Sequence, residues 1–211
     1  DILSMVSLPD FDINKRRDIK DLNYINRATK GVYELGSVFK TFTFTAGLNE
    51  GEIELETPFL GLKKKIYCAG RPIGEYDDKI PPDLTAEEIL IRSGNIGSVR
   101  IAQRIGREGM KDFLNSIGVL NKIDFDIEEV GKPMSFRWGK CKLATASFGH
   151  GITTTLLQVA KGYSIISNGG FEIKPTLIKK EKKEDKKIRI LKEGVSREIN
   201  SILRKIVSSK E

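Results

Sequence analysis

The sequence predicts an α+β fold, and two observations lead to that prediction. Segments that we interpret as strands lie near both ends of the chain, at residues 2–8, 171–178 and 187–191. Between them, apolar residues recur at helical spacing in several segments. Strands near both ends with helices in the middle indicate an α+β or three-layer arrangement.

The composition fits one globular domain or a large part of one. The chain has 211 residues, of which 39% are hydrophobic and 31% are charged. Charges interrupt the apolar runs well before about 18 residues, so we expect no membrane-spanning helix. The first residues, Asp1-Ile2-Leu3-Ser4, lack the basic and apolar regions of an export signal.

The net charge of +7 comes mainly from one local run. Residues 179–192 contain eight basic and three acidic residues, so +5 of the +7 lies in this segment. Basic residues do not alternate with aromatic ones, as they do on a surface that binds single-stranded nucleic acid, so we expect no nucleic-acid partner. We interpret the run as a solvated hairpin or loop, with contact to an anionic membrane surface or polymer as the alternative.

The first half of the chain begins with an expected strand at residues 2–8. Residues 37–48 are apolar enough for a helix, although their β-branched and aromatic side chains require burial to stabilise it. Residues 50–82 are rich in Gly, Pro and charge, which predicts loops with short strands. Thr85 and Glu88 form a capping box that starts the next helix.

Helices are expected through most of the second half. Residues 96–105 and 110–117 form two of them, and Gly118 is placed to end the second. Residues 155–167 form another. The last helix follows Ser196, a candidate N-cap. The apolar face of that last helix contains Ile199, Ile202, Leu203 and Ile206.

The cysteines and the histidine do not indicate a metal site. Cys68 and Cys141 lie far apart and form no C-x-x-C motif. We expect both to be free, buried thiols, although an oxidising compartment would permit a disulfide. His150, between two glycines, is interpreted as a turn residue near a cleft and not as a catalytic base.

Ser37 and Lys40 form an S-x-x-K pattern, which can combine a nucleophile with its base. In a helix, Lys40 lies one turn after Ser37 on the same face. A serine attacks well only when a base removes its proton, and a lysine whose pKa is lowered by burial can be that base. Backbone N–H groups at the helix start can stabilise an oxyanion. The pattern also occurs by chance in a Lys-rich chain.

A second candidate motif, Ser93-Gly94-Asn95, falls between two predicted helices. A serine hydroxyl can pass a proton, and an asparagine can orient a lysine or a substrate amide. Taken alone, S-x-N is a common turn or cap.

The motifs together, in this order, resemble the transpeptidase domain of class B penicillin-binding proteins. An S-x-x-K with an S-D-N-type motif is characteristic of penicillin-binding proteins and class A β-lactamases. Residues 33–40, YELGSVFK, resemble the family's Y-E-P-G-S-x-F-K box, and residues 91–97, IRSGNIG, resemble its S-x-N-I-G element. Residues 146–152, ASFGHGI, resemble its F-G-x-G segment, and the helix at 157–170 is similar to the one that follows. The resemblance extends over residues 2–178.

Some positions depart from the family pattern. Leu35 and Leu156 stand where the family usually has proline. No Lys-Thr-Gly or Lys-Ser-Gly occurs in the 211 residues, whereas the family has this motif on a strand after the helix that here ends near Glu211. We therefore expect a partial transpeptidase domain over residues 1–211, incomplete at both ends and inactive by itself. A degenerate pseudoenzyme is the alternative.

The resemblance implies a fold like that of penicillin-binding proteins and serine β-lactamases, an antiparallel sheet with a helical subdomain. It implies a peptidoglycan D,D-transpeptidase in which Ser37 attacks the D-Ala-D-Ala end of a stem peptide and Lys40 takes its proton. Ser93 would relay a proton to the leaving D-alanine, and Asn95 would hold Lys40 and the substrate amide. β-Lactams would acylate Ser37. No metal or organic cofactor is implied.

The resemblance also implies an inner-membrane protein whose catalytic domain works in the periplasm, with membrane-bound division or glycosyltransferase partners. Glu34 favours the septal, cell-division type over the elongation type. Two alternatives stay open: another serine acyl-enzyme, such as a D,D-carboxypeptidase or β-lactamase, and a non-catalytic β-lactam sensor or division scaffold. Trp138, Asp77-Asp78 and Glu87-Glu88 are interpreted as structural.

Overall fold

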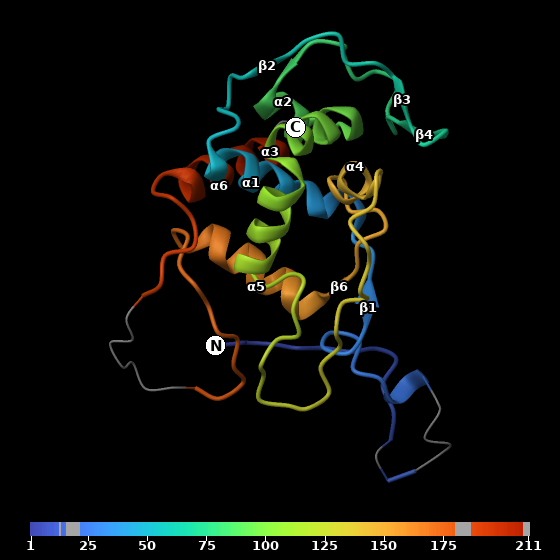
Figure 1. The fold of residues 1–211 in the computed structure, drawn as a ribbon. Helices are drawn as coiled ribbons and strands as arrows, with labels where there is room; N and C mark the ends of the chain where they lie inside the picture. Colours follow the sequence, from blue (N-terminus) through green and yellow to red (C-terminus); the bar gives the residue numbers. More distant parts are fainter. Residues whose placement is uncertain (13, 16–21, 180–186, 209–211) are drawn as a thin grey trace.

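Helices form the centre of the structure, and short antiparallel strand pairs lie around them (Figure 1). The computed structural model describes residues 1–12, 14–15, 22–179 and 187–208. The α-helices are α1 (Lys40–Glu50), α2 (Ala86–Ile91), α3 (Asn95–Ser116), α4 (Lys142–Ala146), α5 (Leu156–Ser167) and α6 (Val195–Ser208). The 3₁₀ turns are η1 (Leu22–Tyr24) and η2 (Gly36–Phe39). The strands are β1 (Val32–Tyr33), β2 (Pro58–Phe59), β3 (Lys65–Cys68), β4 (Arg71–Gly74), β5 (Leu84–Thr85) and β6 (Thr154–Thr155).

The described strands form three separate antiparallel pairs, β1–β6, β2–β5 and β3–β4. The pair β1–β6 places the segment that enters η2 beside the segment that enters α5. The pair β3–β4 is a hairpin at the edge of the molecule, above α4 in Figure 1. The combination of helices with antiparallel strands confirms the predicted α+β class.

The end segments that we predicted as strands do not form strands in the described residues, so that prediction was wrong. The two ends of the chain do meet, because the Ile2 amide donates to the Thr176 carbonyl at 2.8 Å. Phe171 and Arg189 form one isolated antiparallel bridge. A strand requires a partner in register along its length, and the local sequence does not supply that partner.

The helix expected over residues 37–48 is confirmed, but it begins with the 3₁₀ turn η2 and becomes α-helical at Lys40. Every residue of α1 from Lys40 to Leu48 is buried. The helix packs against α3 and α6, so neighbours cover it all round. This burial explains how a segment with a weak intrinsic helix preference is stabilised.

The two helices expected at residues 96–105 and 110–117 are the two parts of α3. Gly106 separates them, because its φ of 76° and ψ of 172° lie outside the helical region. The capping box of Thr85 and Glu88 is present at the start of α2. A second capping box, Thr155 with Gln158, starts α5 and was not predicted.

The last helix, α6, begins at Val195, two residues earlier than predicted. Ser196 lies inside it and is not its N-cap, so that prediction was wrong. The Ser196 hydroxyl donates to the Ile166 carbonyl at 2.5 Å and accepts from the Gly169 amide at 3.2 Å. It therefore joins α6 to the end of α5. On the predicted apolar face, Ile199 and Ile202 are fully buried.

The two cysteines form a disulfide, which corrects the expectation of free, buried thiols. Cys68 ends β3 and Cys141 immediately precedes α4, and both are half-buried. Their Cα atoms are 5.7 Å apart, within the range that a disulfide spans. The sequence separation of 73 residues gave no sign of this contact, because the fold alone brings the hairpin and α4 together.

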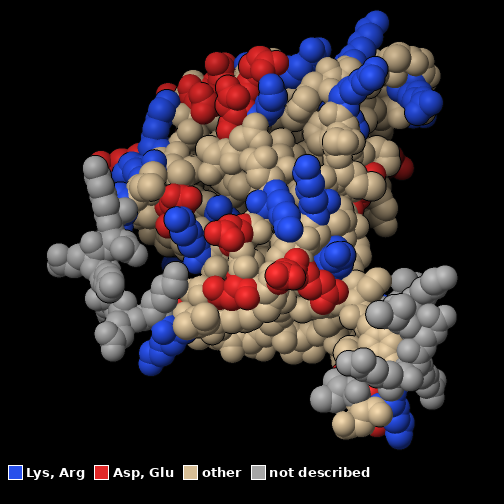
Figure 2. Space-filling model, turned by 60° about the horizontal axis from the view of Figure 1, so that its bottom comes forward, with Lys and Arg blue, Asp and Glu red and all other residues tan. Residues whose placement is uncertain are grey.

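Charges of both signs are mixed on the face shown in Figure 2, where Lys and Arg side chains alternate with Asp and Glu side chains. Residues 180–186, at the centre of the basic run, lie outside the described residues. Among the described helices, none is both long enough and apolar enough to cross a membrane.

Candidate active site

Ser37 lies on the 3₁₀ turn η2, at the entrance to α1, and its side chain is exposed. The Lys40 backbone amide donates to the Ser37 carbonyl, which continues the turn into the α-helix. Gly36 has a φ of 55°, and its amide donates to the Gly149 carbonyl at 3.3 Å. The exposed serine is therefore held at a sharp entry to a buried helix.

Gly149 supports this turn from the side. Its φ is 79°, and a Cβ atom added to it would lie 2.1 Å from the Gly36 carbonyl oxygen. Only glycine permits both the positive φ and the close approach. The Thr43 hydroxyl donates to the Ser147 carbonyl at 2.8 Å, so α1 and residues 146–152 are joined at a second point.

Lys40 is buried, with 2% of its surface exposed, and its ammonium group meets Ser93. Its Nζ atom donates to the Ser93 carbonyl at 2.5 Å and to the Ser93 hydroxyl at 3.0 Å. Burial lowers the pKa of Lys40 from 10.5 to about 8, and the charge of Glu75 partly opposes this change. A lysine with such a pKa is partly neutral near pH 7, so it can accept a proton.

Ser93 adopts a left-handed backbone conformation, with a φ of 56°, in the turn between α2 and α3. This conformation costs a residue other than glycine about 1–2 kcal/mol. Here it lets both Ser93 oxygens face Lys40. Strain of this kind is common at functional sites.

Asn95 begins α3, and its side chain contacts the hairpin. Its Nδ2 atom donates to the Gly74 carbonyl at 2.9 Å, on strand β4. The structure therefore brings Lys40 and Ser93 together, and it anchors Asn95 to β4 beside them. The contact of Asn95 with Lys40 and with a substrate amide stays a prediction.

Glu75 contributes to the site and was missed in the sequence. Its carboxylate accepts from the Asn95 amide at 2.6 Å and from the Ile96 amide at 2.9 Å, so it caps α3. It is also the charge that raises the pKa of Lys40 against the effect of burial. No local pattern indicates this role, since Glu75 lies 20 residues before Asn95 in a loop-like segment.

Tyr163, on α5, is a second residue that supports the site. Its hydroxyl lies 2.9 Å from the Val38 carbonyl and 2.9 Å from the Thr41 hydroxyl, at the start of the helix that carries Ser37. Burial raises the pKa of Tyr163, and the bond with Thr41 partly opposes this. The tyrosine thus fixes α5 against the nucleophile turn.

The other side chains considered in the sequence lie at structural positions or at the edge of the site. Trp138 is half-buried against Phe136, with ring centroids 5.1 Å apart. Glu87 forms an ion pair with Lys205. His150 Nδ1 lies 3.3 Å from a Glu34 carboxylate oxygen. Within the described residues, no group of three or more His, Cys, Asp or Glu side chains could hold a metal ion.

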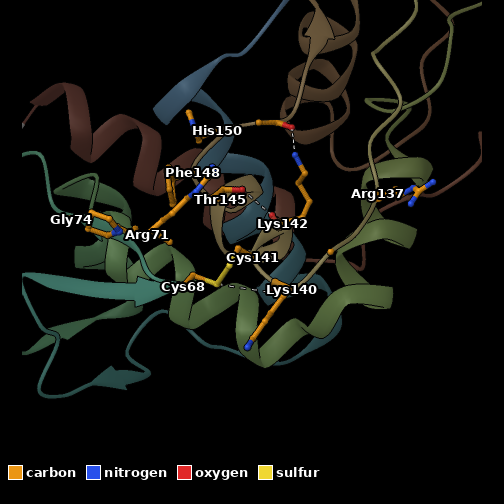
Figure 3. A pocket seen from close by; sticks show the side chains of 14 residues that line it. Cys68, Arg71, Gly74, Arg137, Lys140, Cys141, Lys142, Thr145, Phe148 and His150 are labelled. Atoms are coloured by element: carbon orange, nitrogen blue, oxygen red, sulfur yellow. Dashed lines mark hydrogen bonds between the residues drawn. A yellow bond between two sulfur atoms is a disulfide. The ribbon is translucent and has the colours of Figure 1, made fainter.

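A pocket of about 620 Å³ adjoins the site (Figure 3). Strand β4 forms one wall with Arg71–Gly74, and Gly74 is the residue that accepts from Asn95. The opposite wall comes from residues 137–151, which include Phe148 and His150. The Cys68–Cys141 disulfide lies between the two walls.

Several relatives of this chain are described as probable peptidoglycan D,D-transpeptidases. It is 32% identical over 209 residues to a probable peptidoglycan D,D-transpeptidase FtsI from Caulobacter vibrioides. That alignment covers 97% of this chain and 35% of the FtsI protein. It is 29% identical over 206 residues to a probable peptidoglycan D,D-transpeptidase PenA from Neisseria meningitidis. That alignment covers 96% of this chain and 35% of the PenA protein. The chain thus spans about a third of the length of these relatives.

Solved structures share the fold. A peptidoglycan glycosyltransferase from Burkholderia ambifaria matches with a TM-score of 0.81 and 25% identity, over 89% of this chain and 60% of that one. The apo transpeptidase domain of penicillin-binding protein 3 from Burkholderia pseudomallei matches with a TM-score of 0.80 and 25% identity, over 86% and 56%. The profile of the penicillin binding protein transpeptidase domain matches residues 1–211. The chain therefore belongs to the penicillin-binding protein transpeptidase domain family.

Proposed function

We propose that this chain is the serine-bearing part of a peptidoglycan D,D-transpeptidase, with Ser37 as the nucleophile and Lys40 as its base. The observation that carries this proposal is the buried Lys40 amine. It lies one helical turn after Ser37, its pKa is lowered to about 8, and it meets the second motif at Ser93. Family membership supports the same reaction class.

In the proposed reaction, the Ser37 hydroxyl attacks the carbonyl carbon of the penultimate D-alanine, and the neutral Lys40 amine takes the proton. The bond to the terminal D-alanine then breaks, and that amine leaves with a proton passed through Ser93. An amine from a second stem peptide attacks the acyl-enzyme ester, which forms the cross-link and returns the proton to Ser37. Each step transfers one acyl group and needs no redox partner.

We further propose that the protein works in the periplasm, attached to the inner membrane, in septal wall synthesis with division or glycosyltransferase partners. The disulfide supports an oxidising compartment, because such bonds persist in the bacterial periplasm and are rare in the cytosol. The motif around Glu34 and the similarity to an FtsI protein support the septal role.

The proposal is tested with penicillin and the protein expressed from its full reading frame. Intact mass should increase by one penicillin, and peptide mapping should place the adduct on Ser37. Ser37→Ala should show no adduct. An adduct on another serine, or none on a folded wild-type protein, would overturn the assignment.

The acceptor distinguishes transpeptidation from the other serine acyl-enzyme reactions. A D-Ala-D-Ala donor peptide is supplied with and without an amine acceptor, and the products are separated by chromatography. We expect cross-linked product and a long-lived penicillin adduct. Hydrolysis alone would indicate a carboxypeptidase, rapid penicillin turnover a β-lactamase, and penicillin binding without peptide turnover a sensor or scaffold.

A further inference from the structure

The pocket beside the active site has cationic residues on both walls. Arg71 lies on the hairpin wall, and Lys140 and Lys142 lie on the α4 wall. None of the described residues that line the pocket is Asp or Glu. In the described part of the chain, neither Arg71 nor Lys140 forms an ion pair. Two unbalanced charges therefore border one hollow.

Lys142, on the α4 wall, is held in place by two contacts. Its side chain is half-buried, its Nζ atom donates to the Gly151 carbonyl at 2.6 Å, and it lies 4.7 Å from the centre of the Phe136 ring. These contacts fix the charge in place and leave ammonium hydrogens for another acceptor. The disulfide holds the hairpin wall to the α4 wall, so the spacing between Arg71 and Lys140 is constrained.

The pocket borders the candidate active site through residues that contact it, although Ser37, Lys40, Ser93 and Asn95 do not line the pocket. Gly74 lines it and accepts from Asn95. Phe148 and His150 also line it, and they flank Gly149, whose carbonyl accepts from the Gly36 amide beside Ser37. A peptide bound at Ser37 would therefore have this cationic hollow next to it.

We propose that this pocket binds a free carboxylate carried by the peptide substrate away from its D-Ala-D-Ala end, with Arg71 and Lys140 as the charged partners. The inference rests on the proposed function and adds a substrate preference to it. Arginine and lysine bind carboxylates through charge-assisted hydrogen bonds, which are stronger than neutral ones. The partial enclosure of the pocket, with the half-buried Lys142 on one wall, strengthens the attraction.

The test compares two peptides that both end in D-Ala-D-Ala and differ only in whether one internal carboxyl group is free or amidated. Both are measured by equilibrium binding to a Ser37→Ala variant of the full-length protein, so that chemistry is not required. Wild-type turnover of the same peptides gives kcat/KM. We expect the free acid to bind about tenfold more tightly, and we expect Arg71→Gln and Lys140→Gln each to remove most of that preference.

Arg137→Gln is the control, since Arg137 lines the same wall but lies farther along the chain from the disulfide than Lys140, which adjoins Cys141. It should keep the preference for the acid. Penicillin acylation of Ser37 should be unchanged in all three variants. Equal binding of the two peptides, or a preference that survives both Arg71→Gln and Lys140→Gln, would overturn this proposal. Absence of penicillin acylation in the wild type would instead overturn the proposed function. The peptide-binding measurements on Ser37→Ala would still show whether the pocket binds the carboxylate.

Discussion

The amine of Lys40 is buried against the Ser93 turn, with Glu75 as its charged neighbour. Its burial favours the neutral form, and the neutral form is the one that can accept the proton of Ser37. The charge of Glu75 opposes the lowering of the Lys40 pKa by burial, so it helps to set how basic the amine is. The chemistry of the site therefore depends on a balance between desolvation and one carboxylate, which can be measured through pH.

The rate of penicillin acylation should rise with pH and level off above about pH 8, the pKa of Lys40. With that pKa, about a tenth of the amine is neutral at pH 7, against about one part in three thousand for an ordinary lysine. The measurement is the second-order acylation rate constant over a pH series. Lys40→Arg should lower this rate constant at least about a hundredfold, because arginine keeps the charge but cannot lose its proton. A rate independent of pH, or a mild effect of Lys40→Arg, would show that another group is the base.

The same pKa predicts a dependence of stability on pH. The unfolded chain has a Lys40 pKa of 10.5 and the folded chain about 8, so the unfolded state binds more protons between these values. The free energy of unfolding should therefore rise as pH increases from about 8 towards about 10.5. Lys40→Met should remove this rise, which chemical denaturation at several pH values would detect. A Lys40→Met curve that kept the same slope would assign the effect to other groups.

Glu75→Gln should move the acylation profile to lower pH, because the substitution removes the charge that raises the pKa of Lys40. Glutamine keeps one acceptor for the α3 amides, so the stability loss should be modest, about 1 kcal/mol. The pH midpoint separates this role from a purely structural one. Glu88→Gln, which keeps an acceptor in the capping box of α2, is a control that should leave the midpoint in place.

At the scale of elements, the candidate active site is formed by segments that are distant in the sequence and adjacent in the fold. The entrance of α1 carries Ser37, residues 146–152 support it, and the turn between α2 and α3 supplies Ser93. The contact between Gly36 and Gly149 is the closest of these approaches, because no side-chain atom fits between the two backbones.

Gly149→Ala should lower the free energy of unfolding by about 3 kcal/mol and slow the acylation of Ser37. The added Cβ would lie 2.1 Å from the Gly36 carbonyl oxygen, so the turn before Ser37 must shift. Gly51→Ala is the matched control, because Gly51 has nearly the same φ of 78° but nothing within 4 Å of its Cβ position. It should cost only about 1 kcal/mol and leave acylation unchanged. Equal effects of the two substitutions would show that strain in φ, and not the close approach, is what matters.

Local signals in the sequence predicted the helices well and the pairing of distant segments poorly. The Thr85–Glu88 capping box and the glycine at position 118 act within a few residues, so they could be recognised directly. Ser37, Lys40 and Ser93 were found because their motifs are short, and the structure places Lys40 against Ser93. Glu75 could not be found in this way, nor could the contact of Ile2 with Thr176, because those contacts depend on the fold.

At the scale of the whole molecule, the disulfide joins the β3–β4 hairpin to the helical part. In Figure 1 the hairpin lies at the edge of the molecule, and in the described residues it meets the rest through α3 and the segment at α4. The bond closes a loop of 73 residues that contains β4, α2 and α3. It therefore links the stability of the domain to the geometry of the cationic pocket.

Replacing both cysteines, Cys68→Ser with Cys141→Ser, should lower the free energy of unfolding by about 4 kcal/mol, the chain-entropy value for a loop of this length. Denaturation of the wild type with and without reductant should show the same loss, and the double variant should not respond to reductant. Because the bond also fixes the spacing between Arg71 and Lys140, the double variant should bind the free-acid peptide less selectively while still reacting with penicillin at Ser37. Unchanged selectivity together with lowered stability would mean that the bond stabilises the fold but does not shape the pocket. Unchanged stability would mean that the hairpin is held by its other contacts.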